Sequence, residues 1–227
     1  YEEEFGFTKG YAFSPDSRKV AYLKFDESRV PLFEMMRFDG SLYNKAYEFK
    51  YPKAGDCNST VTLWVADLET GVTEQIYTGE ESDRYIPNLG WTPSSELYFY
   101  RVDRRQRLFE VVVERDDMQQ IIYTESSPRY VERPIGEVIR FIDEDRFIVR
   151  EETSAGWWHL YLHSIEKGRL KTLTSGEWEV VSVLHADKRG VWYTSTERGS
   201  SCRDLYRVDL RGKSKFRLTD SDGWHQI

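Results

Sequence analysis

One pattern of turns and strands recurs along this chain, and the recurrence limits the folds that it can adopt. An apolar or aromatic residue precedes a short polar turn, and a β-strand follows the turn. Copies of this phrase begin at Phe13, Trp91, Phe141 and Leu184, and the last three recur about every 40 to 50 residues. A second phrase, a short strand, an acidic or Gly turn and another strand, follows at 63–71, 159–168 and 204–212.

A period of this length with four short strands per unit is typical of β-propeller blades. Such a unit cannot bury both of its faces alone, so it stacks on its neighbours. The sequence therefore predicts an all-β fold, a partial β-propeller of about four four-stranded blades with an inserted hairpin arm. We expect the blades at 8–78, 85–126, 137–179 and 180–223, with the arm inserted at 26–60. An all-β sandwich is the alternative, and the repeated turns favour the propeller.

The insertion has a composition unlike that of the repeat. Met and aromatic residues lie outside the strand pattern, which favours a protruding hairpin with an apolar surface, and such surfaces usually mark contacts with a partner. The alternative is a long loop folded back on its own blade. The residues of interest on this segment are Met35, Met36, Tyr43, Tyr47 and Tyr51.

Charge, hydropathy and metal-binding residue types exclude several classes of function. The net charge of −7 argues against nucleic-acid binding, which needs a basic face. No apolar run approaches the ~20 residues that span a bilayer. Cys57 and Cys202 are isolated, and His159 and His163 lie in an alternating strand pattern that separates them by ~13 Å. We therefore expect free thiols, no metal site and no cofactor.

The chain starts with three consecutive carboxylates between two aromatic residues, Tyr1-Glu2-Glu3-Glu4-Phe5. Adjacent carboxylates repel each other and are costly to bury unless a cation joins them. Held in a cavity, such a cluster would bind an ammonium group, whereas on a solvated surface it would have no such role. Successive residues of a strand face opposite ways, so Glu3 and Glu4 can act together only from a helical or irregular segment. We expect a short helix over 1–5.

These features together resemble the N-terminal propeller region of the dipeptidyl peptidase IV family, serine exopeptidases of the prolyl oligopeptidase class. Their order and approximate spacing match over nearly the whole chain. This sequence departs from the family's pattern in that the family's propeller disulfides have no counterpart here, which suits a bacterial-type member. The matching segments are Tyr1-Glu2-Glu3-Glu4, Phe13-Ser14-Pro15-Asp16, Val30-Pro31-Leu32, Tyr51-Pro52-Lys53-Ala54-Gly55 and Gly176-Glu177-Trp178-Glu179-Val180.

The resemblance implies an eight-bladed propeller above an α/β-hydrolase domain, in a hydrolase that releases N-terminal X-Pro or X-Ala dipeptides. Glu3 and Glu4 are then the pair that binds the α-ammonium of peptides with a free N-terminus. The chain has no Gly-x-Ser-x-Gly motif. The resemblance places the catalytic Ser, Asp and His beyond Ile227, so we expect a fragment without the hydrolase domain that is inactive alone.

The resemblance also implies that the parent protein is a homodimer joined through the arm, and that it is periplasmic, extracellular or membrane-associated. Further pocket residues are expected near 130–139, without assignment to single positions. Two other functions stay open: the propeller of a prolyl tripeptidyl peptidase, and a non-enzymatic β-propeller that binds peptides or proteins.

Overall fold

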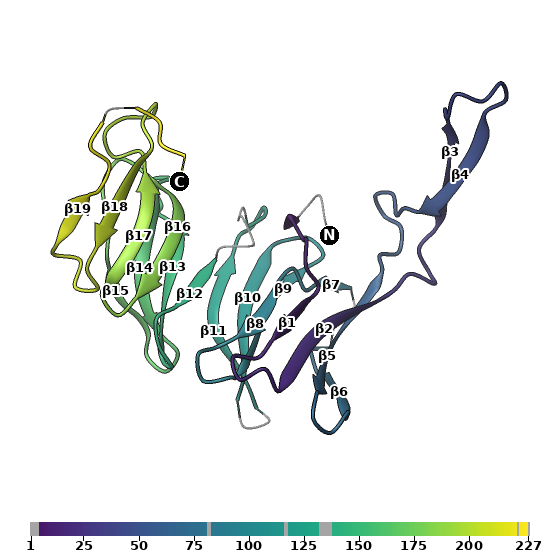
Figure 1. The fold of residues 1–227 in the computed structure, drawn as a ribbon, viewed down its shortest axis with the longest axis horizontal. Helices are drawn as coiled ribbons and strands as arrows, with labels where there is room; N and C mark the ends of the chain where they lie inside the picture. Colours follow the sequence, from purple (N-terminus) through teal and green to yellow (C-terminus); the bar gives the residue numbers. More distant parts are fainter. Residues whose placement is uncertain (1–4, 81–82, 116–117, 132–137, 222, 227) are drawn as a thin grey trace.

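The computed structural model describes residues 5–80, 83–115, 118–131, 138–221 and 223–226. Within these residues the strands form four antiparallel sheets in chain order and one separate two-stranded hairpin (Figure 1). The predicted fold class, a partial β-propeller with an inserted hairpin arm, is confirmed. In the part of the chain described, no helix has the length and apolar character needed to cross a bilayer.

The first two sheets lie next to each other at the N-terminal end of the chain. In the second sheet, β7 and β8 both pair with β9, and Pro87 lies between them, where it has no N–H to donate. The first sheet has the order β1 (Tyr11–Phe13), β2 (Lys19–Asp26), β5 (Thr60–Asp67) and β6 (Thr73–Ile76). The second contains β7 (Arg84–Tyr85), β8 (Leu89–Trp91), β9 (Leu97–Asp103), β10 (Leu108–Arg115) and β11 (Met118–Ser126).

The third and fourth sheets each run in simple chain order, as meanders of four strands. The third has β12 (Ile139–Phe141), β13 (Arg146–Glu152), β14 (Trp158–Ser164) and β15 (Gly168–Thr172). The fourth has β16 (Val180–Asp187), β17 (Gly190–Ser195), β18 (Asp204–Val208) and β19 (Lys215–Arg217).

The repeated turn adopts the same backbone geometry in its first two copies. Ser17 and Ser95 occupy equivalent positions and both have positive φ, 59° and 63°. The N–H of each donates to the carbonyl oxygen three residues earlier, on Ser14 and on Thr92, at 2.9 Å. The sequence repeat therefore encodes one type of turn in these two copies, which leads into β2 in the first sheet and β9 in the second.

Among the described residues, three inter-sheet cores hold consecutive sheets together. Because side chains alternate along a strand, one strand supplies two cores. On β10, Val112 packs in the core between the first and second sheets, whereas Val111 and Val113 pack in the core between the second and third. On β13, Phe147 faces the second sheet and Ile148 faces the fourth. This face-to-face stacking is the packing expected of propeller blades.

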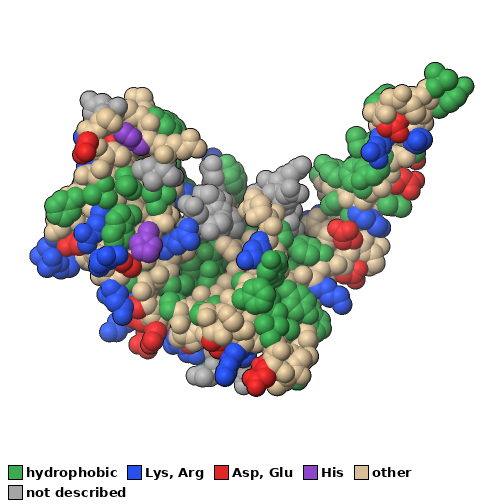
Figure 2. All heavy atoms as spheres, viewed as in Figure 1, with side chains coloured by type: hydrophobic (Ala, Val, Ile, Leu, Met, Phe, Trp, Pro, Cys, Tyr) green, Lys and Arg blue, Asp and Glu red, His purple; other side chains and the backbone are tan. Residues whose placement is uncertain are grey.

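The inserted arm projects away from the sheets. It consists of β3 (Leu32–Arg37) and β4 (Lys45–Lys50), which pair only with each other among the described strands. Figure 2 shows hydrophobic side chains along the arm and at its tip. The arm leaves the first sheet between β2 and β5, so both of its connections return to the same sheet.

Candidate functional site

The residues predicted to bind the substrate ammonium, Glu3 and Glu4, lie outside the described residues. The first residue that the structure describes is Phe5, which directly follows Glu4 and has helical backbone conformation. The Phe5 side chain is only 6% exposed and belongs to the core between the second and third sheets. The end of the acidic triplet is therefore bonded to a residue that is fixed in the protein interior.

The ring of Phe5 packs on Tyr85 of β7, with ring centroids 5.0 Å apart and planes at 60°. The hydroxyl oxygen of Tyr85 accepts a hydrogen bond from the side-chain amide of Asn58 at 2.9 Å. Asn58 lies in the connection that leads from the arm back to β5. Three segments that are distant in sequence thus meet at Phe5, the residue that follows the triplet in the sequence.

These residues line a groove of about 390 Å³ between the N-terminal segment and the root of the arm. Its walls combine aromatic rings with amide, hydroxyl and carboxylate groups. Such a mixture suits a ligand that has both an apolar and a polar part. The lining residues are Phe5, Phe25, Glu27, Pro52, Asn58, Ser59, Tyr85 and Gln106.

A hydrogen bond from Arg104, which is itself held by an ion pair, ties the root of the arm to the second sheet. Arg104 reaches both carboxylate oxygens of Asp83, at 3.2 and 3.0 Å, and donates to the carbonyl oxygen of Asp56 at 2.5 Å. The hydrogen bonds with Asp83 raise the pKa of Arg104. At the other connection, the Lys50 ammonium donates to the carbonyl oxygen of Val30 at 2.7 Å. The segment that carries Asn58 is therefore tied at its start to another sheet.

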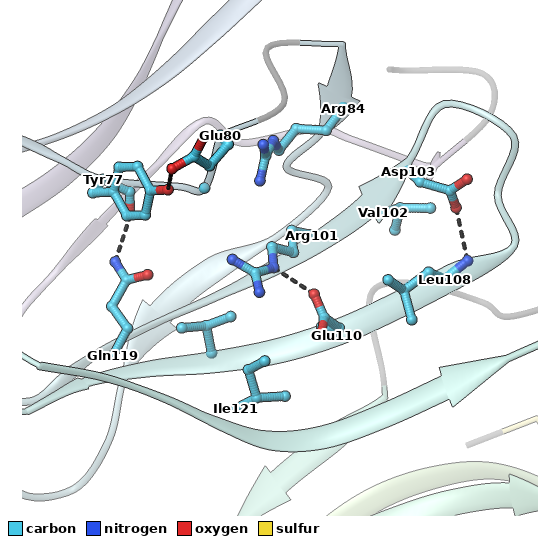
Figure 3. Close-up of a pocket in the computed structure, with 12 residues that line it drawn as sticks. Tyr77, Glu80, Arg84, Arg101, Val102, Asp103, Leu108, Glu110, Gln119 and Ile121 are labelled. Atoms are coloured by element: carbon cyan, nitrogen blue, oxygen red, sulfur yellow. Dashed lines mark hydrogen bonds and ion pairs between the residues drawn. The ribbon is translucent and has the colours of Figure 1, made fainter.

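A second hollow, of about 470 Å³, lies between the β6–β7 connection and the second sheet (Figure 3). Arg101 forms an ion pair with Glu110 at 2.5 Å, and both Arg84 and Arg101 donate to the carbonyl oxygen of Thr78. Figure 3 shows Glu80, Arg84 and Arg101 directed into the same space. Acidic and basic groups compensate one another here, so this hollow is a weaker candidate for binding a charged ligand.

The five predicted arm residues lie on different parts of the hairpin. Met35 pairs directly with Tyr47, so these two share one face, and Met36 lies on the other face. Tyr43 is 81% exposed in the tip between the strands. Tyr51 follows β4 and packs against the rings of Phe33 and Phe49. The arm therefore presents apolar groups on both faces rather than one continuous stripe.

The segment expected to contribute further pocket residues is described only at its ends. Tyr130 is exposed, Val131 is buried, and Val138 and Ile139 are buried in the core between the second and third sheets. Among the residues that the structure covers, no group of three or more His, Cys, Asp or Glu side chains is placed to hold a metal ion. Cys57 and Cys202 are free thiols.

Sequence reasoning did not identify Tyr85 or Asn58. The signal available was indirect: Asn58 closely follows Tyr51-Pro52-Lys53-Ala54-Gly55, one of the segments on which the resemblance rests. Nothing in the local sequence pairs Asn58 with Tyr85, because their contact depends on how the first sheet docks on the second.

Comparisons with known proteins identify the family. The family described as the dipeptidyl peptidase IV (DPP IV) N-terminal region matches residues 1–227. Dipeptidyl peptidase 4 of Trichophyton rubrum is 30% identical over 94% of this chain and 30% of its own length, and that of Arthroderma otae is 28% identical over the same shares. The crystal structure of Porphyromonas gingivalis dipeptidyl peptidase 4 superposes with a TM-score of 0.89 and 30% identity, over 99% of this chain and 32% of that one.

The chain thus spans about 30% of the length of the curated relatives that it matches. The match to the family extends over the entire chain and agrees with the stacked-sheet fold. The chain therefore belongs to the dipeptidyl peptidase IV N-terminal region family.

Proposed function

We propose that this chain is the substrate-selecting propeller part of a serine-type dipeptidyl peptidase that releases X-Pro or X-Ala dipeptides from peptide N-termini. The observation that carries the proposal is the family match over residues 1–227, which includes the acidic triplet. The relatives that it matches are named dipeptidyl peptidases. The catalytic Ser, Asp and His belong to a hydrolase domain outside this chain, and the chain alone has no peptidase activity.

In this proposal Glu3 and Glu4 bind the substrate's α-ammonium. An α-amino group titrates near pH 8, so most of it is cationic at neutral pH. Each carboxylate about 4 Å from the ammonium contributes a gross attraction on the order of 4 kcal/mol at an effective dielectric constant near 20. A peptide without a free amine leaves both carboxylates unpaired, and this penalty restricts the enzyme to chain ends.

The burial of Phe5 supports this role, because the ammonium site needs a firm attachment to the rest of the protein. Glu4 is joined by a peptide bond to Phe5, whose side chain is packed between two sheets. A carboxylate pair at the end of a loose segment would lose side-chain and backbone freedom on each binding event, which lowers affinity. The packing of Phe5 removes part of this cost before the substrate arrives.

The test is the substitution of each glutamate in the full-length protein. Glu3→Gln or Glu4→Gln keeps the side-chain shape and removes the charge, and each lowers kcat/KM for a free-amine X-Pro substrate about a hundredfold or more, which corresponds to ~2.7 kcal/mol. Glu2→Gln is the matched control and retains activity. Full activity in both the Glu3 and the Glu4 variant would refute the assignment. Product analysis on X-Pro and X-X-Pro peptides separates dipeptidyl from tripeptidyl cleavage.

We also propose that the full-length protein is a homodimer joined through the arm. Support comes from the exposed apolar side chains on both faces of a hairpin whose strands pair with no other sheet among the described residues. A Met35→Lys/Met36→Lys double variant, with one lysine on each face, sediments as a monomer. The matched control is Leu68→Lys, at a similarly exposed apolar residue in the turn between β5 and β6. An unchanged dimer in the double variant would refute the role of the arm.

A further inference from the structure

A short series of contacts holds Phe5, the residue that follows the acidic triplet in the sequence. Phe5 packs on Tyr85 at 5.0 Å between ring centroids, and the Tyr85 hydroxyl accepts the side-chain N–H of Asn58 at 2.9 Å. Each member comes from a different segment: the N-terminal segment, β7 of the second sheet, and the connection that follows the arm.

Other interactions fix both Tyr85 and the segment that carries Asn58. On the second sheet, Tyr85 pairs with Val102 of β9, which is buried in the core between the second and third sheets. On the arm side, the carbonyl oxygen of Asp56, two residues before Asn58, accepts a hydrogen bond from Arg104. The Tyr85 hydroxyl is therefore held between two supported segments, and its position is not set by Phe5 alone.

We propose that Tyr85 and Asn58 are positioning residues for recognition of the substrate ammonium. Asn58 orients Tyr85, Tyr85 holds the ring of Phe5, and Phe5 fixes the backbone to which Glu4 is joined. The inference rests on the proposed function, in which Glu3 and Glu4 bind the ammonium. Neither Tyr85 nor Asn58 contacts the ammonium in this account; both act through Phe5.

The expected consequence is a selective loss of ammonium recognition. The attraction between a carboxylate and an ammonium falls as their separation grows, and a displacement of ~1 Å in a positioned site can cost large factors in rate. Proline recognition and the chemistry at the scissile bond depend on other groups and stay unchanged. The effect should therefore appear in the binding of amine-containing ligands and not in kcat.

The experiment compares two small inhibitors of the full-length protein, alanyl-pyrrolidide and propionyl-pyrrolidide, which differ only by the amino group. The ratio of their inhibition constants measures ammonium recognition. Tyr85→Phe keeps the ring and removes the hydrogen-bonding oxygen, and Asn58→Leu removes the donor. Each is expected to weaken alanyl-pyrrolidide binding about two- to tenfold, the usual effect of one hydrogen bond, and to leave propionyl-pyrrolidide binding and kcat unchanged.

Three further variants make the test specific. Tyr123→Phe is the matched control, because the Tyr123 hydroxyl is also hydrogen-bonded to a side chain: it donates to Glu125 at 3.2 Å within the second sheet. It leaves the ratio unchanged. Asn58→Asp keeps the ratio of the parent protein, unlike Asn58→Leu, since the Tyr85 hydroxyl can donate to a carboxylate. The double variant Asn58→Asp/Tyr85→Phe keeps the added charge but lacks the hydrogen bond, and its ratio falls as in Tyr85→Phe alone. This result separates the effect of the hydrogen bond from the effect of the charge.

The outcomes distinguish this inference from the proposed function. If Glu3→Gln and Glu4→Gln collapse the ratio but Tyr85→Phe and Asn58→Leu leave it unchanged, the positioning role is overturned and the proposed function stands. An unchanged ratio in the glutamate variants overturns the proposed function itself. A purely structural role is shown by a lower melting temperature in Tyr85→Phe with an intact ratio, and that result also overturns the positioning role.

Discussion

Replacing Phe147 with alanine tests whether the inter-sheet cores hold the sheets together. Phe147 is fully buried on β13, with its ring 5.8 Å from that of Phe141 and 5.4 Å from that of His163. It lies in the core between the second and third sheets, together with side chains from both. Truncating a buried phenylalanine to alanine removes its transfer free energy and leaves a cavity, at a cost of about 3–5 kcal/mol.

Hydrogen exchange of the full-length protein measures this cost locally. When amides exchange through an opening that breaks this core, each 1.4 kcal/mol of lost stability raises the exchange rate about tenfold. The expected rise in peptides covering β9, β10 and β13 is about 150- to 4,000-fold. Phe216→Ala is the matched control, because Phe216 is 58% exposed on β19 and its truncation leaves no cavity. A rise of less than about fivefold in all three strands of the Phe147 variant would refute the reasoning.

Two further predictions concern stability. Gly90→Ala would place a Cβ atom 2.6 Å from the Tyr98 ring on the neighbouring strand, so we expect a loss of about 1–3 kcal/mol in urea unfolding; an unchanged midpoint would contradict this. The hydrogen bond from Arg115 holds the pKa of Glu96 below its ordinary value of 4.5. The ionised carboxylate therefore stabilises the fold above that pH. This contribution is lost as the pH falls through the lower pKa of the folded state. Glu96→Gln is therefore less stable than the parent near pH 7, and the difference in unfolding free energy shrinks toward pH 3; a difference that grows on acidification would contradict the assignment.

The repeat of strands and turns could be predicted because each blade is specified locally. A polar turn, which contains Pro in the first two copies, precedes the strand, and alternation along the strand assigns its two faces. The positive φ of Ser17 and Ser95 shows that equivalent positions in the repeat form equivalent turns. The division of the first strand of the second sheet into β7 and β8, around Pro87, was not predicted, because the repeat pattern does not specify where a strand is interrupted.

The candidate site was less predictable than the fold. The acidic triplet could be read from the sequence, but Glu3 and Glu4 lie outside the described residues, and their role stays a proposal. The contacts from Phe5 through Tyr85 to Asn58 could not be read at all. They depend on the docking of one sheet on another and on the return path of the arm, and these are set by many distributed apolar contacts rather than by a local motif.

The most direct test of the central claim is the pH dependence of kcat/KM for two substrates whose amines have different pKa values. An alanyl-Pro anilide and its β-fluorinated analogue serve, because fluorine lowers the amine pKa without removing the amine. If the ammonium form is the one bound, the alkaline limb of kcat/KM shifts to lower pH by the difference between the two amine pKa values. The same alkaline limb for both substrates would contradict recognition of the substrate ammonium.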